Sequence, residues 1–186
     1  MEKRRSDRLS PAARGMIRNT SLGAMCLALC MVLPFVTGQI PQIGAMLCPM
    51  HLPVLLCGFI CGPWYALIIG AAAPLLRFAI FGMPPIYPTG IAMCFELMTY
   101  GLVSGLLYKL LPKNKVNIWV SLLAAMLAGR LVWGCVRAVI SGAGGAGFTW
   151  AAFISGGFTS AVPGIILQLV LIPAVVLALR KARLMD

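Results

Sequence analysis

Long apolar runs are the feature of this sequence that most constrains its fold. Of the 186 residues, 61% are hydrophobic and only 10% are charged, whereas a soluble domain is about half apolar and a quarter charged. A bilayer span needs about 20 mostly apolar residues. The runs predict six spans, at residues 16–36, 50–61, 64–81, 89–111, 116–140 and a last one that begins between 150 and 162 and ends at 179. We therefore expect an all-α, six-transmembrane-helix bundle in residues 16–182, after a basic tail in residues 1–15.

The basic residues predict how this bundle is oriented. Twelve of the 15 lie at the two ends of the chain or in one connection: Lys3, Arg4, Arg5, Arg8, Arg14, Arg18, Lys109, Lys113, Lys115, Arg180, Lys181 and Arg183. The alternate connections, residues 37–48, 82–88 and 141–150, contain no charged residue. By the positive-inside rule, both termini are expected to be cytoplasmic. No Phe or Tyr is interleaved with the basic residues as a nucleic-acid surface would favour, so the net charge of +11 indicates a membrane and no nucleic-acid partner.

A second group of charges lies inside the apolar runs. Ionisable residues in a membrane normally face the bundle interior or a wet cavity. Counted along the predicted helices, these charges fall in the outer half, which indicates a cavity open to the outside. Arg130, Trp133 and Arg137 share one helix face, and Glu96 and Tyr100 share another. The candidate substrate-binding residues are His51, Arg77, Tyr87, Glu96, Tyr100, Arg130, Trp133 and Arg137.

The charge balance of this group points to the ligand. Three Arg residues against one Glu leave two positive charges, and Arg binds carboxylate or phosphate in a bidentate manner. We therefore expect a small anion. The alternative is that Glu96 pairs with Arg130 to hold two helices together, while Arg77 and Arg137 reach the membrane interface. The seven Cys residues follow no metal-binding or disulfide pattern and are interpreted as free core residues, so no metal or cofactor is expected.

Small residues four apart allow a second helix to approach closely. Such pairs occur at Ala24 and Ala28 in the first predicted span and at Gly101 and Gly105 in the fourth. Either pair could serve a partner protein or packing within the bundle.

Taken in order, these features resemble the substrate-binding S components of energy-coupling factor (ECF) transporters, which take up vitamins in prokaryotes. The resemblance covers nearly the whole chain. It is carried by the small pair Ala24 and Ala28, the short second helix ending in Cys-Gly-Pro-Trp-Tyr at residues 61–65, and the acid in Met-Cys-Phe-Glu-Leu at residues 93–97. One departure is Ala66, which stands where the family has a glycine.

The resemblance implies a subunit of the cell membrane that works with partners. Ala24 and Ala28 would dock on a transmembrane coupling protein, and two ATPase subunits would supply energy. This chain has no Gly-xxxx-Gly-Lys-Ser/Thr phosphate loop, so it is not expected to hydrolyse ATP. The stretch PMHLPVLLCG is most similar to S components associated with pantothenate. Lipoate or another carboxylated vitamin fits the charge equally, whereas cationic thiamine does not.

Two other classes of function remain open on the sequence. An intramembrane enzyme could use His51, Glu96 and a Cys as an acid–base or nucleophilic set. The sequence contains no HExxH, no intramembrane Asp pair and no Gly-x-Ser-x-Gly motif to support such an enzyme. A structural membrane protein without a ligand is the third possibility.

Overall fold

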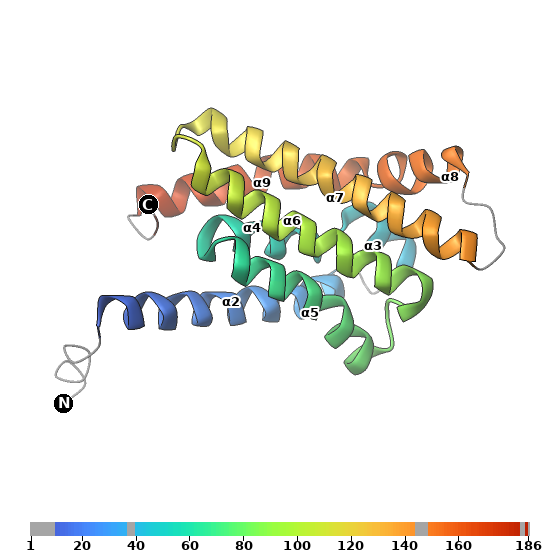
Figure 1. Ribbon diagram of the computed structural model, residues 1–186, viewed down its shortest axis with the longest axis horizontal. Coiled ribbons are helices and arrows are strands. Elements are labelled where there is room, and N and C mark those ends of the chain that lie inside the picture. Colours follow the sequence, from blue (N-terminus) through green and yellow to red (C-terminus); the bar gives the residue numbers. More distant parts are fainter. Residues whose placement is uncertain (1–9, 37–39, 144–148, 183–184, 186) are drawn as a thin grey trace.

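The structure is a computed structural model, which describes residues 10–36, 40–143, 149–182 and 185. Over these residues the chain is all-helical (Figure 1). With the labels of Figure 1, the elements are α2 (Pro11–Val36), α3 (Pro41–Leu47), α4 (His51–Cys61), α5 (Pro63–Phe81), the kinked segment η1 (Ile86–Gly90), α6 (Ile91–Leu110), α7 (Lys115–Ala143), α8 (Trp150–Ile154), the π-helical turn η2 (Ser155–Thr159) and α9 (Val162–Lys181).

Five helical segments among the described residues are long and apolar enough to cross a membrane: Pro11–Val36, Pro63–Phe81, Ile86–Leu110, Lys115–Gly142 and Val162–Lys181. The predicted span at residues 50–61 is present as α4, which has 11 residues. At 1.5 Å per residue α4 is about 16 Å long, half of the roughly 30 Å hydrocarbon core. It follows the seven-residue helix α3, and Cys48 joins the two in a left-handed conformation with φ of 47°. The second of the six predicted spans is therefore a short helix and too short for a full crossing.

Glycines explain two of the helix boundaries. Gly62 separates α4 from α5 with φ of 92°, which disfavours residues with a side chain. Pro63 then begins α5, where its missing N–H would have no helical partner. Gly82 ends α5 with φ of 69°, and its N–H donates to the carbonyl of Phe78 at 2.8 Å. These boundaries place the start of α5 at one end of the bundle and the Pro-rich turn after Gly82 at the other.

Helix α6 lies against α4, α5 and α7 and forms the centre of the bundle. Glycines allow its backbone to approach the neighbouring helices closely. A Cβ atom at Gly101 would stand 2.6 Å from the carbonyl oxygen of Ala66, and one at Gly105 would stand 2.6 Å from the nitrogen of Pro63. The pair Gly101 and Gly105 is thus used for packing inside the chain. By contrast, Ala24 and Ala28 are exposed on the outer side of α2.

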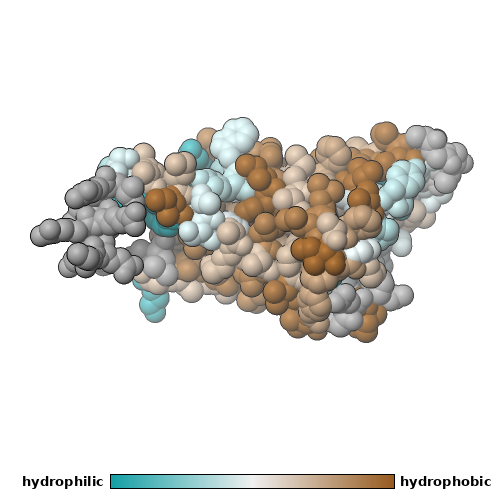
Figure 2. All heavy atoms as spheres, turned by 90° about the horizontal axis from the view of Figure 1, so that it is seen from below, coloured by the Kyte–Doolittle hydropathy of each residue, from teal (hydrophilic) through white to brown (hydrophobic). Residues whose placement is uncertain are grey.

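The bundle has two distinct ends and an apolar surface between them. Helix α2 begins and α9 ends at the same end, with α8 and η1 at the opposite end (Figure 1). Figure 2 shows hydrophobic side chains over the middle of the molecule. Many large apolar side chains of the described residues are exposed, including Val32, Ile68 and Leu127. A surface of this kind fits lipid contact, and together with the long apolar helices it indicates a multi-pass membrane protein.

Candidate functional site

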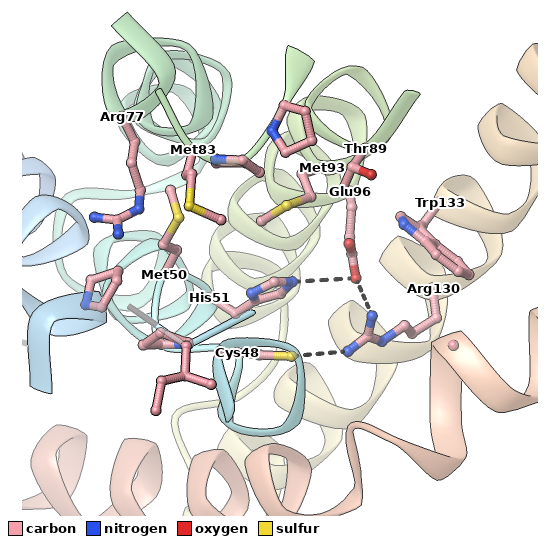
Figure 3. Close-up of a pocket in the computed structure, with 17 residues that line it drawn as sticks. Cys48, Met50, His51, Arg77, Met83, Thr89, Met93, Glu96, Arg130 and Trp133 are labelled. Carbon is pink, nitrogen blue, oxygen red and sulfur yellow. Dashed lines mark hydrogen bonds and ion pairs between the residues drawn. The ribbon is translucent and has the colours of Figure 1, made fainter. Parts of the chain in front are cut away.

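A cavity of about 380 Å³ opens in the half of the bundle that holds α8 and η1. We call it the outer cavity, after the orientation expected from the basic residues (Figure 3). It lies among the ends of α2, α5 and α6, the connection between α3 and α4, and the middle of α7. Its lining residues are Pro34, Ile40, Gly44, Cys48, Pro49, Met50, His51, Arg77, Met83, Pro84, Pro85, Thr89, Met93, Glu96, Arg130, Trp133 and Gly156.

His51, Glu96 and Arg130 form the polar wall of this cavity, and Glu96 of α6 is its centre. Its side chain is buried, with an exposed fraction of 1%. Its Oε1 atom lies 2.8 Å from Nη1 of Arg130 and accepts a hydrogen bond from the Tyr100 hydroxyl at 3.0 Å. Pairing with Arg130 offsets the cost of burying the carboxylate, and the pair links α6 to α7. The pairing of these two residues, which was one part of the alternative raised by the sequence, is therefore present, and both residues also line the cavity.

Arg130 has a second partner in the connection between α3 and α4. Its Nη2 atom donates to Sγ of Cys48 at 3.5 Å. Burial raises the pKa of the Cys48 thiol, although the charge of Arg130 opposes the shift. A neutral thiol thus leaves the ion pair between Arg130 and Glu96 as the main electrostatic contact here. The contact also ties the left-handed turn at Cys48 to α7.

His51 stands beside the ion pair at the start of α4. Its Nε2 atom lies 3.3 Å from Oε1 of Glu96, and its ring meets the Tyr100 ring edge-on at 5.2 Å. Although that separation suits an ion pair, the ring is not aligned for a hydrogen bond. Neither ring nitrogen has a hydrogen-bond partner among the described residues, and both are buried. A ligand with a hydroxyl or amide group could satisfy them.

Arg77 of α5 supplies the other polar part of the cavity (Figure 3). Its exposed fraction is 4%, so it does not reach out to the membrane interface. Its Nη1 donates to the carbonyl of Met31 at 3.1 Å, and its guanidinium lies 5.7 Å and 5.3 Å from the rings of Phe35 and Phe81. No carboxylate among the described residues pairs with it. Arg77 is therefore a buried cation whose charge is uncompensated by the described part of the chain.

The space between the two polar groups is apolar. Figure 3 shows Met50, Met83 and Met93 between Arg77 and the pair of Glu96 and Arg130. These methionines come from three different segments and were not predicted as site residues, although Met93 lies three residues before Glu96 and hence on its helix face. Flexible thioether side chains adapt to irregular ligand shapes. The cavity thus suits a ligand that is polar at both ends and apolar between them.

The structure places the eight predicted site residues in three groups. His51, Arg77, Glu96, Arg130 and Trp133 line the outer cavity. Tyr100 is buried behind Glu96 and positions its carboxylate.

Tyr87 and Arg137 are not among the residues that line the cavity. Tyr87 is 61% exposed, and its hydroxyl donates to the carbonyl of Ile140 at 3.4 Å. Arg137 is half-buried, and its Nε and Nη1 atoms have no hydrogen-bond partner among the described residues. The charge surplus of the cavity is therefore one, from Arg77, instead of the two expected from the sequence.

The comparisons with known proteins give one match. The family model described as "ECF transporter, substrate-specific component" matches residues 22–176. No curated protein and no solved structure matches this chain. The match covers most of the 186 residues and includes every residue of the polar wall. It implies a transporter subunit with a small-molecule substrate and ECF module partners, and not an enzyme. The chain belongs to the family of substrate-specific components of ECF transporters.

Proposed function

We propose that this chain binds a small, singly charged anionic vitamin in the outer cavity for uptake into a prokaryotic cell. The observation that carries the proposal is the buried charge of Arg77, which no carboxylate among the described residues compensates. An isolated charge is costly to bury, and a ligand carboxylate would neutralise it through a charge-assisted hydrogen bond.

Pantothenate is the vitamin that we favour. Its carboxylate would meet Arg77, its dimethyl-substituted carbon would contact Met50, Met83 and Met93, and its hydroxyl and amide groups would reach His51 and Glu96. Lipoate also carries a carboxylate but offers no hydroxyl or amide to the ring of His51, whose nitrogens have no hydrogen-bond partner among the described residues. Cationic thiamine would add a second uncompensated charge beside Arg77.

Transport would need partners, because the chain has no phosphate loop for ATP. We propose that a coupling protein in the membrane docks on α2 and that two ATPase subunits drive the cycle. Ala24 and Ala28 are exposed on α2, while Gly23, Cys26 and Cys30 of the same helix are buried against the bundle. Small side chains four residues apart let a partner helix come close. Residues 16–182 would form this single transmembrane unit, with both termini and the tail of residues 1–15 in the cytoplasm.

The ligand can be identified by mass spectrometry of small molecules extracted from the purified protein. Titration calorimetry with pantothenate, lipoate and thiamine then ranks them. We expect pantothenate to bind at micromolar concentration or below, without being chemically changed. Tighter binding of thiamine, or of an uncharged vitamin, would contradict the anionic site. Conversion of the bound compound would contradict a transport role.

The docking surface can be tested separately with Ala24→Trp and Ala28→Trp. Because both side chains are exposed, we expect each variant to fold and to keep the substrate affinity of the unmodified chain, while a bulky ring prevents close helix approach. Uptake by cells that express the complete transporter should fall to background. Leu29→Trp, on the same helix at another exposed position, is the matched control. Normal uptake by both the Ala24→Trp and the Ala28→Trp variants would contradict the docking role of these residues.

A further inference from the structure

A second cavity lies at the opposite end of the bundle, where α2 begins and α9 ends. We call it the inner pocket. Its volume is about 410 Å³. It is lined by Arg18, Gly58, Phe59, Ile60, Cys61, Gly62, Pro63, Trp64, Tyr65, Gly105, Tyr108, Lys109, Lys113 and Met185. None of these residues lines the outer cavity, so the two cavities are separate.

Three cationic side chains from different segments meet at the inner pocket. Arg18 comes from α2, Lys109 from the last turn of α6, and Lys113 from the connection after α6. The sequence has four acidic residues, of which Glu96 alone is described by the structure, and Glu96 is in the outer cavity. No described carboxylate therefore neutralises these three charges. An anion that binds in the pocket would neutralise part of this positive charge.

The backbone adds to this positive character. Helix α5 begins at Pro63, and its first turn lines the pocket. The first N–H bonded within the helix is that of Ala66, which donates to the carbonyl of Gly62, so the helix itself provides no partner for the N–H groups of Trp64 and Tyr65. The positive end of the dipole of this 19-residue helix thus faces the same space as Arg18, Lys109 and Lys113. Phosphate groups bind readily where a helix N-terminus and basic side chains coincide.

The pocket wall is held in place by Arg180 of α9. Its Nε donates to the Tyr108 hydroxyl at 2.8 Å, and its Nη1 donates to the carbonyl of Lys113 at 3.0 Å. The guanidinium also lies 5.1 Å from the centroid of the Tyr108 ring, and Nζ of Lys113 lies 5.7 Å from the same centroid. These contacts fix the segment that carries Lys113 relative to α6, so the basic rim does not depend on a loose connection.

We infer that the inner pocket binds the phosphate of an anionic phospholipid headgroup. The group that the pocket would recognise is a phosphate ester, which both a phospholipid and a soluble metabolite carry. The position favours lipid, because the pocket lies where apolar helices end and basic residues gather. Trp64 at its rim is 72% exposed, as expected of a Trp at a membrane–water interface. The bound lipid would hold the inner ends of α2, α4, α5 and α6 together.

The test uses the full chain purified in detergent and examined by native mass spectrometry with added phosphatidylglycerol or phosphatidylcholine. We expect the anionic lipid to remain bound and the zwitterionic lipid to dissociate. Each basic residue near an anionic surface contributes about 1 kcal/mol, or about fivefold in affinity. Three such contributions multiply, so the triple variant Arg18→Gln/Lys109→Gln/Lys113→Gln should weaken phosphatidylglycerol binding by about 100-fold.

A matched control removes the same charges outside the pocket. Arg14, Lys115 and Lys181 are exposed and do not line it. The variant Arg14→Gln/Lys115→Gln/Lys181→Gln should change phosphatidylglycerol affinity by less than about threefold if the pocket is specific, since these charges act only at longer range. An equal loss in both triple variants would mean diffuse attraction and would overturn the proposal. If the pocket triple variant does not fold, Arg18→Gln alone should still show a drop of about fivefold.

Two further outcomes distinguish a lipid from other possible occupants of the pocket. Glycerol 3-phosphate at millimolar concentration should not displace phosphatidylglycerol; displacement would assign the pocket to a soluble phosphate ester. Unchanged lipid binding in the pocket triple variant, together with failed assembly with the coupling protein, would assign the pocket to a protein partner. Either result would overturn the lipid proposal.

Discussion

The outer cavity and the inner pocket have similar volumes, about 380 Å³ and 410 Å³, and opposite electrostatic designs. In the outer cavity the charged side chains are buried, and Glu96 and Arg130 neutralise each other within the fold. In the inner pocket Arg18, Lys109 and Lys113 are exposed and have no described carboxylate partner. Water and headgroups can solvate the inner charges, while the outer charges depend on the protein itself.

This difference has a consequence for mutagenesis. Removing a buried charge leaves its partner without compensation, so the outer cavity couples substrate binding to stability. Removing an exposed charge costs little stability, so the inner pocket can lose its ligand without unfolding. Arg77 is intermediate, because it is buried but donates to a neutral carbonyl. The following predictions test this contrast, beginning with the largest expected effect.

Glu96→Ala should be the most damaging change. It leaves the guanidinium of Arg130, which is 7% exposed, without its carboxylate, and breaking a buried pair in this way costs about 3–5 kcal/mol of unfolding free energy. Thermal unfolding of the purified protein measures the loss, with Lys109→Ala as the control for an exposed charge. Equal stability of the two variants would break the contrast between the cavities.

The double variant Glu96→Leu/Arg130→Leu sharpens the same point. Replacing both members of a buried pair by apolar residues is often neutral for stability. We expect the double variant to unfold at a higher temperature than Glu96→Ala and still to bind no substrate. Recovery of substrate affinity in this variant would show that the polar wall is structural only.

Arg77→Met should weaken substrate binding by about 10- to 150-fold, which corresponds to the 1.5–3 kcal/mol of a hydrogen bond to a charged group. Titration calorimetry with the co-purified ligand measures the change. Arg137→Met is the matched control, because Arg137 does not line the cavity, and its affinity should stay within about twofold of the unmodified chain. A larger effect at Arg137 than at Arg77 would move the anion site toward the end of α7.

The smallest effect is expected for the inner pocket. Arg18→Gln/Lys109→Gln/Lys113→Gln should change the unfolding free energy, measured without added lipid, by no more than about 0.5 kcal/mol per residue. Substrate affinity should be unchanged, because the outer cavity contains none of these residues. A large drop in substrate affinity would show that the two cavities are coupled.

The sequence was sufficient to predict much of this molecule. The length of the apolar runs predicted the long helices, because a chain segment in lipid must satisfy its own backbone hydrogen bonds and a helix does so. The cost of burying charge indicated that Glu96 and Arg130 would lie in a polar cavity. The short second helix was also predicted, since Pro and Gly limit it on both sides.

The tertiary structure decided which predicted residues share the cavity. Helical spacing puts Arg130, Trp133 and Arg137 on one face, but Arg130 and Arg137 are about 10 Å apart along α7. Only Arg130 and Trp133 of these three residues line the cavity. Arg77 faces the cavity because α5 packs against α6 through Gly70, where a Cβ atom would stand 2.5 Å from the carbonyl oxygen of Leu97. Periodicity fixes how side chains are arranged around one helix, whereas the rotation and depth of that helix depend on contacts with its neighbours.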